Sequence, residues 1–322
     1  MWIQRTSPSA DLYFAGSMER DLESGIAVQL SPTVFCIDDA LVVVRHLSGL
    51  RSEPDTKRLI YVVDDDWRAG LSDHSLSLGY RANLALREAR QGRRLERRAN
   101  VILTSTTALA DQIKSRWPNK HVETLEPAWP QATTGLSAER PIQLAYLSAA
   151  THRADFEFIK PVLETVISHK RLHLTVTANA PIPPAWKTAS NVTVLPVLDW
   201  GGYKNWMGGK EFDIGLYPIR DTPFNAMRSR NKLLEFDQFG AALLCSKTWQ
   251  PGARAAAENR CIALANDVSE WQAALPNLCD TPGSAKSLAC ANRRAIAIEN
   301  PQEVQRLLWC RILGRDSRYG RS

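Results

Sequence analysis

Short apolar runs alternate along this chain with segments of helical periodicity. Apolar runs of about four to eight residues are typical of buried strands, whereas apolar residues three and four apart indicate helices. In the first half the predicted strands are Leu12–Ala15, Ala40–Val44, Leu59–Val63, Val101–Thr104 and His121–Thr124, and the predicted helices are Leu78–Arg98 and Ala108–Trp117. This alternation favours an α/β fold with parallel sheets.

The alternation restarts after Glu126–Pro141, a segment with three prolines and few apolar residues that is typical of a linker. Beyond it the predicted strands are Ile142–Ser148, Leu172–Thr177, Val192–Leu195, Ile214–Tyr217, Ala241–Cys245 and Cys261–Ala265, and the predicted helices are Asp155–Ser168, Ala226–Phe239, Val268–Ala274, Pro282–Ile298 and Pro301–Leu313. We therefore expect two α/β domains, residues 1–135 and 136–322, with a ligand cleft at the carboxyl ends of their strands. The final helices could pack back on the first domain.

The segment Asp213–Ser246 carries the clearest chemistry. In its predicted helix, Arg228, Lys232 and Glu235 fall on one narrow face at about 100° per residue, with Met227, Leu233 and Leu234 opposite. Cations and free N–H groups near a helix N-terminus suit a diphosphate, and a carboxylate can accept from ribose hydroxyls. The alternative is a solvated helix face with an internal ion pair.

Composition and charge set the class of protein. The 322 residues are 44% apolar and 23% charged, as in ordinary globular proteins. No apolar run approaches the ~18 residues of a membrane span, no signal-peptide pattern is recognisable and the six cysteines form no C-x-x-C pair, so we expect a cytoplasmic protein with reduced thiols. Residues 1–140 contain 18 Lys/Arg and 18 Asp/Glu, whereas residues 141–322 contain 22 and 16. The net charge of +6 therefore lies in the second half, as a polyanionic ligand would favour.

Three segments of the second half, 142–166, 192–203 and 211–246, resemble the donor-binding domain of GT-B glycosyltransferases, specifically the family 4-like (group 1) enzymes. The first half is similar more loosely, through 41–48, 61–67 and 100–113. The residues at corresponding positions are Thr151, His152, Asp155, Asp213, Pro218, Asp221, Phe224, Asn225, Ser229, Lys232 and Glu235. The resemblance implies two Rossmann-like domains facing across a cleft, and transfer of a sugar from a nucleoside-diphosphate sugar to a hydroxyl acceptor, retaining and without metal or other cofactor.

The same resemblance assigns roles to single residues. Glu235 would bind the ribose, and Arg228 and Lys232 would hold the diphosphate and assist its departure. The remaining donor-site residues would be Asn225, Ala226, Ser229, Thr151 and Arg153, with His152 over the phosphates or the sugar. Two positions depart from the family pattern: Arg228 replaces its usual lysine, and Met227 replaces the first member of its paired glutamates.

Asp64, Asp65 and Asp66 follow the strand Leu59–Val63. The family-like interpretation makes them a cleft loop on the acceptor side, with Asp66 acting on the hydroxyl and His74 nearby. A second interpretation is helix capping, because Asp at a strand–helix junction satisfies free N–H groups. A third is a metal–diphosphate site of the GT-A type, since hard cations prefer oxygen ligands.

The predicted helix Leu78–Arg98 holds seven arginines and two glutamates. Such a helix could rest on an anionic membrane surface, which would make the protein peripheral to the inner face of the membrane, or could be an exposed helix without a partner. Nucleic acid is not expected, because no aromatic residues interleave with the arginines and no nucleic-acid module surrounds them.

Two other functions stay open. One is a non-catalytic nucleotide- or sugar-binding protein on the same fold, which the substitution at Met227 favours. The other is a nucleotide-dependent oxidoreductase or epimerase, which the absence of a G-x-G-x-x-G after any predicted strand disfavours.

Overall fold

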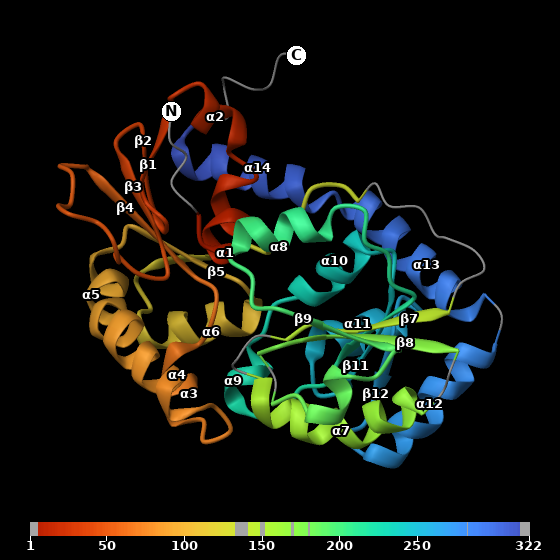
Figure 1. The fold of residues 1–322 in the computed structure, drawn as a ribbon. Coiled ribbons are helices and arrows are strands. Elements are labelled where there is room, and N and C mark those ends of the chain that lie inside the picture. Colours follow the sequence, from red (N-terminus) through yellow and green to blue (C-terminus); the bar gives the residue numbers. More distant parts are fainter. Residues whose placement is uncertain are drawn as a thin grey trace.

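The computed structural model describes residues 6–132, 141–148, 152–168, 171–179, 181–281 and 283–315. Within these ranges the strands form two sheets of six strands each, with helices packed around them. Figure 1 shows the first sheet, in red to yellow, beside the second, in green to blue. The predicted α/β class with two Rossmann-like halves is therefore confirmed.

The first sheet joins an antiparallel hairpin to a parallel part. Its strands pair in chain order: β1 (Ala27–Ser31), β2 (Val34–Ile37), β3 (Ala40–Val44), β4 (Arg58–Val63), β5 (Val101–Thr104) and β6 (His121–Thr124). The first three pair antiparallel and the last four parallel. Around them lie α1 (Pro8–Ala10), η1 (Asp11–Ala15), α2 (Glu19–Glu23), α3 (Trp67–Ser72), α4 (Leu78–Asn83), η2 (Leu84–Ala89), α5 (Arg90–Arg98) and α6 (Thr107–Arg116).

The second sheet is parallel throughout. Its spatial order is β9 (Val192–Leu195), β8 (Leu172–Thr177), β7 (Ile142–Tyr146), β10 (Ile214–Tyr217), β11 (Ala242–Ser246) and β12 (Ile262–Leu264). This is the Rossmann order 3-2-1-4-5-6, in which the chain reverses direction across the sheet between its first and fourth strands. Here these strands are β7 and β10, so a ligand crevice is expected beyond their carboxyl ends.

Helices complete this half and return the chain to the first. They are α7 (Arg153–Ile167), η4 (Pro184–Lys187), α8 (Trp200–Met207), α9 (Pro223–Ala226), α10 (Asn231–Gln238), α11 (Gln250–Ala257), α12 (Val268–Asp280), α13 (Ser284–Glu299) and α14 (Pro301–Leu313). In Figure 1, α14 lies beside the N-terminal helices. The indole of Trp309 packs edge-on against Phe14 at 4.8 Å and donates to the carbonyl of Tyr13 at 2.9 Å.

Several predicted elements need correction. Leu12–Ala15 is helical, because Ser7 caps a helix that begins at Pro8 and continues as a π-helical turn. The predicted helix Ala226–Phe239 begins only at Asn231, as α10, because Ala226 ends the short helix α9 and a turn follows it. The hairpin of β1 and β2 and the helices α2, α3, α8 and α11 were not predicted. The boundary proposed at residue 135 lies outside the described residues, so the division into domains stays a prediction.

One glycine determines how closely α10 packs against the second sheet. A Cβ atom on Gly215, in β10, would lie only 2.2 Å from Cδ1 of Phe236. Phe236, 1% exposed, therefore packs directly on the strand, and α10 lies close against the sheet. This close packing holds the polar residues of α10 near the carboxyl end of β10.

Candidate functional site

A cavity of about 530 Å³ lies between the two halves of the protein, where β4 ends in the first sheet and β7 and β10 end in the second. Both halves line it. The charged and imidazole side chains on its wall are Arg45, His46, Asp64, Asp65, Arg87 and Glu88 from the first half and His152, Arg228, Lys232 and Glu235 from the second. The carboxyl ends of β7 and β10 are where an open parallel sheet of this order binds its ligands.

Arg228 reaches this cavity from the turn between α9 and α10, not from a helix face as predicted. Its guanidinium lies 4.7 Å from the ring centre of Phe224, and Nη1 is 3.5 Å from Oδ1 of Asp65 in the other half. Burial opposes the charge of Arg228, but Asp65, together with Tyr217 and Tyr80, more than offsets it and raises the Arg228 pKa above its usual range. The turn therefore presents a permanent cation to the cavity, and Ser229 beside it also lines the wall.

Lys232 and Glu235 form one unit on α10. The Lys232 ammonium lies 2.6 Å from Oε2 of Glu235 and donates to the carbonyl of Leu147 at 2.9 Å. The other carboxylate oxygen of Glu235 accepts from the Tyr203 hydroxyl. The ion pair anticipated as an alternative is thus present, but it is not solvated: both side chains line the cavity, and only 17% and 7% of their surfaces are exposed.

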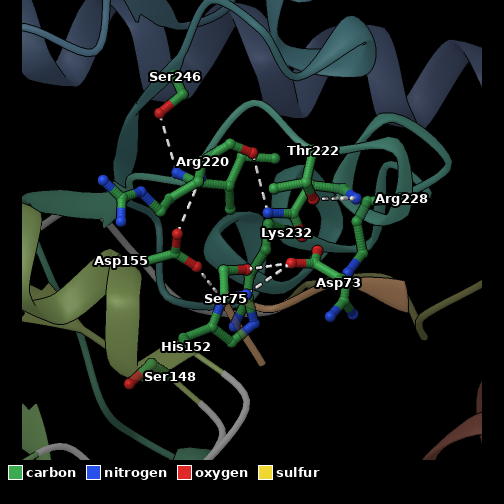
Figure 2. Close-up of polar contacts among 12 residues, drawn as sticks. Asp73, Ser75, Ser148, His152, Asp155, Arg220, Thr222, Arg228, Lys232 and Ser246 are labelled. Carbon is green, nitrogen blue, oxygen red and sulfur yellow. Dashed lines mark hydrogen bonds and ion pairs between the residues drawn. The ribbon is translucent and has the colours of Figure 1, made fainter. Parts of the chain in front are cut away.

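His152 precedes the first residue of α7 and lines the cavity. Figure 2 shows its ring against Asp155: Nδ1 lies 2.7 Å from one carboxylate oxygen, and the other accepts from the backbone N–H of Arg220 at 2.9 Å. Burial lowers the pKa of His152, although Asp155 acts in the opposite direction. A neutral imidazole that donates from Nδ1 leaves Nε2 as an acceptor.

The other predicted donor residues are placed differently. Asn225 is buried and donates to the carbonyl of Arg220 at 2.9 Å, so it shapes the loop after β10 without lining the cavity. Ala226 and Arg153 are exposed and also lie outside the wall. Thr151 lies outside the described residues. Met227, at the position of the missing glutamate, packs against the apolar core of the first half.

On the acceptor side, Asp64 and Asp65 line the cavity and Asp66 does not. Asp66 accepts from the N–H groups of Arg68 and Ala69 at 3.1 and 3.3 Å, so the capping interpretation holds for this residue. His74, also placed here by prediction, is exposed and lies off the cavity wall, 3.2 Å from the Arg81 guanidinium. No cluster of metal-ligating side chains occurs among the described residues.

Arg45 organises the two remaining aspartates. Nη1 lies 3.3 Å from both Asp64 and Asp65, and Nη2 lies 2.5 Å from Glu88. Burial opposes ionisation of Asp65, but Arg228 and Arg45 outweigh it and hold the Asp65 pKa below its usual value. Burial raises the pKa of Asp64 despite Arg45. Each aspartate therefore already has an arginine partner, which disfavours a GT-A-type metal site here.

Arg45, Glu88 and Tyr203 were missed at the sequence level. Arg45 has a left-handed backbone, φ 68°, which is uncommon outside glycine and is held by a hydrogen bond from its N–H to Val62. Glu88 lies in a predicted helix whose many arginines suggest a solvent-exposed basic surface. Tyr203 lies in α8, a segment whose sequence predicts neither a helix nor a binding site. None of the three belongs to a recognisable spacing motif.

The titration of His46, on the same wall, gives a testable pH dependence. Burial, assisted by Arg45 and Arg87, lowers its pKa from 6.5 to about 4. Between these values the unfolded chain binds more protons than the folded one, so the free energy of unfolding falls as pH falls. We expect His46→Gln to lose less stability than the wild type between pH 7 and pH 5 in urea unfolding. His173→Gln, on the second sheet, is the control. Equal losses in wild type and His46→Gln would contradict the assignment.

No protein-family model matches the sequence, and neither does any curated protein. Solved structures do match the fold. Sucrose-phosphate synthase from Thermosynechococcus elongatus superposes with a TM-score of 0.57 and 12% identity over 86% of this chain and 74% of its own. S. aureus TarM superposes with a TM-score of 0.58 and 8% identity, over 81% of this chain and 52% of its own. The pneumococcal O-GlcNAc transferase GtfA superposes with a TM-score of 0.57 and 10% identity, over 88% of this chain and 63% of its own.

These similarities show that the chain has the GT-B fold of glycosyltransferases. The chain spans about half the length of TarM. The TarM structure contains UDP, fondaparinux and α-GlcNAc-glycerol, and the GtfA structure contains UDP and GlcNAc. No described helix is both long and apolar enough to cross a membrane.

Proposed function

We propose that this protein is a glycosyltransferase that moves a sugar from a nucleoside-diphosphate sugar to a hydroxyl group. One observation carries the proposal: Arg228, Lys232, Glu235 and His152 converge on one cavity at the carboxyl ends of β7 and β10, in a GT-B fold. Fold analogy alone does not fix a function. The same cavity, however, provides cations and a carboxylate at the place where parallel sheets of this order generally bind their ligands.

In the proposed reaction the bond from the anomeric carbon to the diphosphate oxygen breaks and a bond to the acceptor oxygen forms. The acceptor proton passes to the departing diphosphate. Arg228 and Lys232 would stabilise the negative charge that grows on this leaving group. Glu235 would bind the ribose hydroxyls. His152, as a neutral imidazole, would not stabilise the leaving group by charge but would accept a hydrogen bond from a sugar hydroxyl at Nε2 and so orient it.

Metal independence is part of the proposal, because the two cations can neutralise the diphosphate and the aspartates opposite are paired with arginines. Retention of configuration and membership of the family 4-like group rest on the sequence resemblance and stay predictions. UDP is the first nucleotide to test, since TarM and GtfA have both been solved with it.

The proposed partners include an anionic membrane surface at the helix formed by α4, η2 and α5. Leu78 and Leu86 are 79% and 68% exposed, and Arg90, Arg93 and Arg97 form no ion pair with any described residue. We expect binding to phosphatidylcholine vesicles only when they contain phosphatidylserine. Replacing the three arginines by glutamine should weaken it on the order of 10²-fold, from about 1 kcal/mol per basic residue. If the variant bound the vesicles as tightly as the wild type, this surface would not be the membrane-binding site.

Thermal unfolding with UDP, other nucleoside diphosphates and their sugars, in the presence of EDTA, tests the proposed function. A ligand at 100 times its dissociation constant adds about 2.7 kcal/mol of stability. Stabilisation by one nucleotide family with EDTA present, followed by release of free sugar or transfer, would support it. Stabilisation only with Mg²⁺ or Mn²⁺ would contradict metal independence. Binding without turnover on any acceptor would favour a non-catalytic binding protein.

A further inference from the structure

Arg230 differs from its neighbours in the turn that carries the donor-site cation. Arg228, Ser229, Asn231 and Lys232 all line the cavity, whereas Arg230 does not. Its backbone precedes the first residue of α10, and its side chain, 17% exposed, points away from the cavity. An arginine at this position is therefore available for a task other than ligand contact.

The partners of Arg230 lie in both segments that connect the two halves. Nη2 is 2.7 Å from Oε2 of Glu126, in the connection that follows β6. Nη1 pairs with Glu299, the last residue of α13, directly before the chain returns to the first half in α14. The two terminal nitrogens of one guanidinium thus bind two segments that are far apart in the sequence.

Further contacts attach both connections to the same part of the second half. The Trp129 indole donates to Oδ1 of Asn231 at 2.7 Å. Glu299 also binds Arg260 at 2.8 Å, and Asn292, which contacts Arg260, donates to the carbonyl of Leu233 in α10 at 3.1 Å. Between Glu299 and α14, Asn300 adopts a left-handed conformation, φ 43°. The chain therefore bends sharply beside the residue that Arg230 holds.

We propose that Arg230 is a positioning residue that links the donor-site turn to both connections between the two halves. Because Arg228 and Arg230 share one short turn, a ligand that moves Arg228 must also act on Glu126 and Glu299 through Arg230. A lysine could not reproduce this, since its single ammonium lacks the planar fork that engages two carboxylates at once. The nucleotide part of the proposal rests on the proposed function, and the mechanical link does not.

Hydrogen exchange of the whole protein tests the link, first without nucleotide. In Arg230→Gln we expect amides in 126–131, in 227–231 and in 299–304 to exchange at least about fivefold faster than in the wild type, the lower bound of ordinary coupling. Amides of β10 and β11 should not change. Arg230→Lys should loosen one connection and not both. The control is Arg254→Gln, an exposed arginine of α11. Unchanged exchange in any one of these three segments of Arg230→Gln would overturn the proposal.

Saturating UDP gives the second arm. In the wild type UDP should slow exchange in the turn and in the connection 126–131, whereas in Arg230→Gln it should slow exchange in the turn only. A merely structural role would lower stability without uncoupling these two responses. Equal protection of the connection in both proteins would overturn the proposal. If UDP fails to bind the wild type, the proposed function fails, and the nucleotide-free comparison decides the link by itself.

Discussion

Replacing Arg228 by alanine is expected to lower kcat on the order of 10²–10³-fold, the usual cost of removing one donor that stabilises charge in the transition state. Arg228 is held for this task between the ring of Phe224 and the carboxylate of Asp65. The fold should persist, because Asp65 keeps its second partner, Arg45, when Arg228 is lost. The measurement is steady-state turnover of the nucleotide sugar that stabilises the protein most.

The conservative variant separates charge from geometry. Arg228→Lys keeps the positive charge and should retain most of the activity. Lysine is also the usual residue at this position in the family that the sequence resembles. If Arg228→Ala turned over substrate at the wild-type rate while its nucleotide affinity was unchanged, Arg228 would have no part in stabilising the leaving group. Loss of activity in both variants with a lower melting temperature would instead indicate a structural role.

Much of the second half could be predicted because its signals are local. The apolar runs that became β7, β8, β9 and β10 are each bounded by polar or turn residues, and their alternation with helices indicates a parallel sheet. Lys232 and Glu235 belong to one helix, so their spacing alone brings them together. Both line the cavity, and their role in donor binding stays a prediction.

The parts that could not be predicted depend on tertiary contacts. Nothing in the sequence marks the break after Ala226, which places Arg228 in a turn opposite Asp65 of the other half. Three consecutive aspartates look alike in sequence, yet Asp66 caps α3 while its two neighbours face an arginine. Arg45 reaches them from the position directly after a different strand, β3, and pairing between strands leaves no trace in residue spacing.

Three cations of the cavity wall are paired with carboxylates: Arg228 with Asp65, Lys232 with Glu235, and Arg45 with Glu88 and both aspartates. A diphosphate bound as proposed would therefore compete with carboxylates for Arg228 and Lys232. The ion pairs hold these side chains in place, which would reduce the conformational entropy lost when a ligand binds. Because Glu235 pairs with Lys232, replacing Glu235 should affect the ribose and the diphosphate of a bound nucleotide in opposite directions.

Replacing Glu235 by alanine is expected to weaken UDP binding by about 10²-fold or more, because hydrogen bonds to a charged group contribute roughly 1.5–3 kcal/mol each and the ribose offers two hydroxyls. The fold should persist, since Lys232 still donates to the Leu147 carbonyl. Inorganic pyrophosphate has no ribose, and it should bind the variant at least as tightly as the wild type because Lys232 is released from its carboxylate.

Comparing the two ligands by calorimetry separates the ribose role from a general loss of the site. Tyr203→Phe is the matched control: it removes one hydrogen bond to Glu235 but leaves the carboxylate and its ion pair with Lys232, so UDP affinity should fall only severalfold. Equal weakening of UDP and pyrophosphate by Glu235→Ala would mean that Glu235 acts by ordering Lys232. The ribose would then have to be bound elsewhere on the wall.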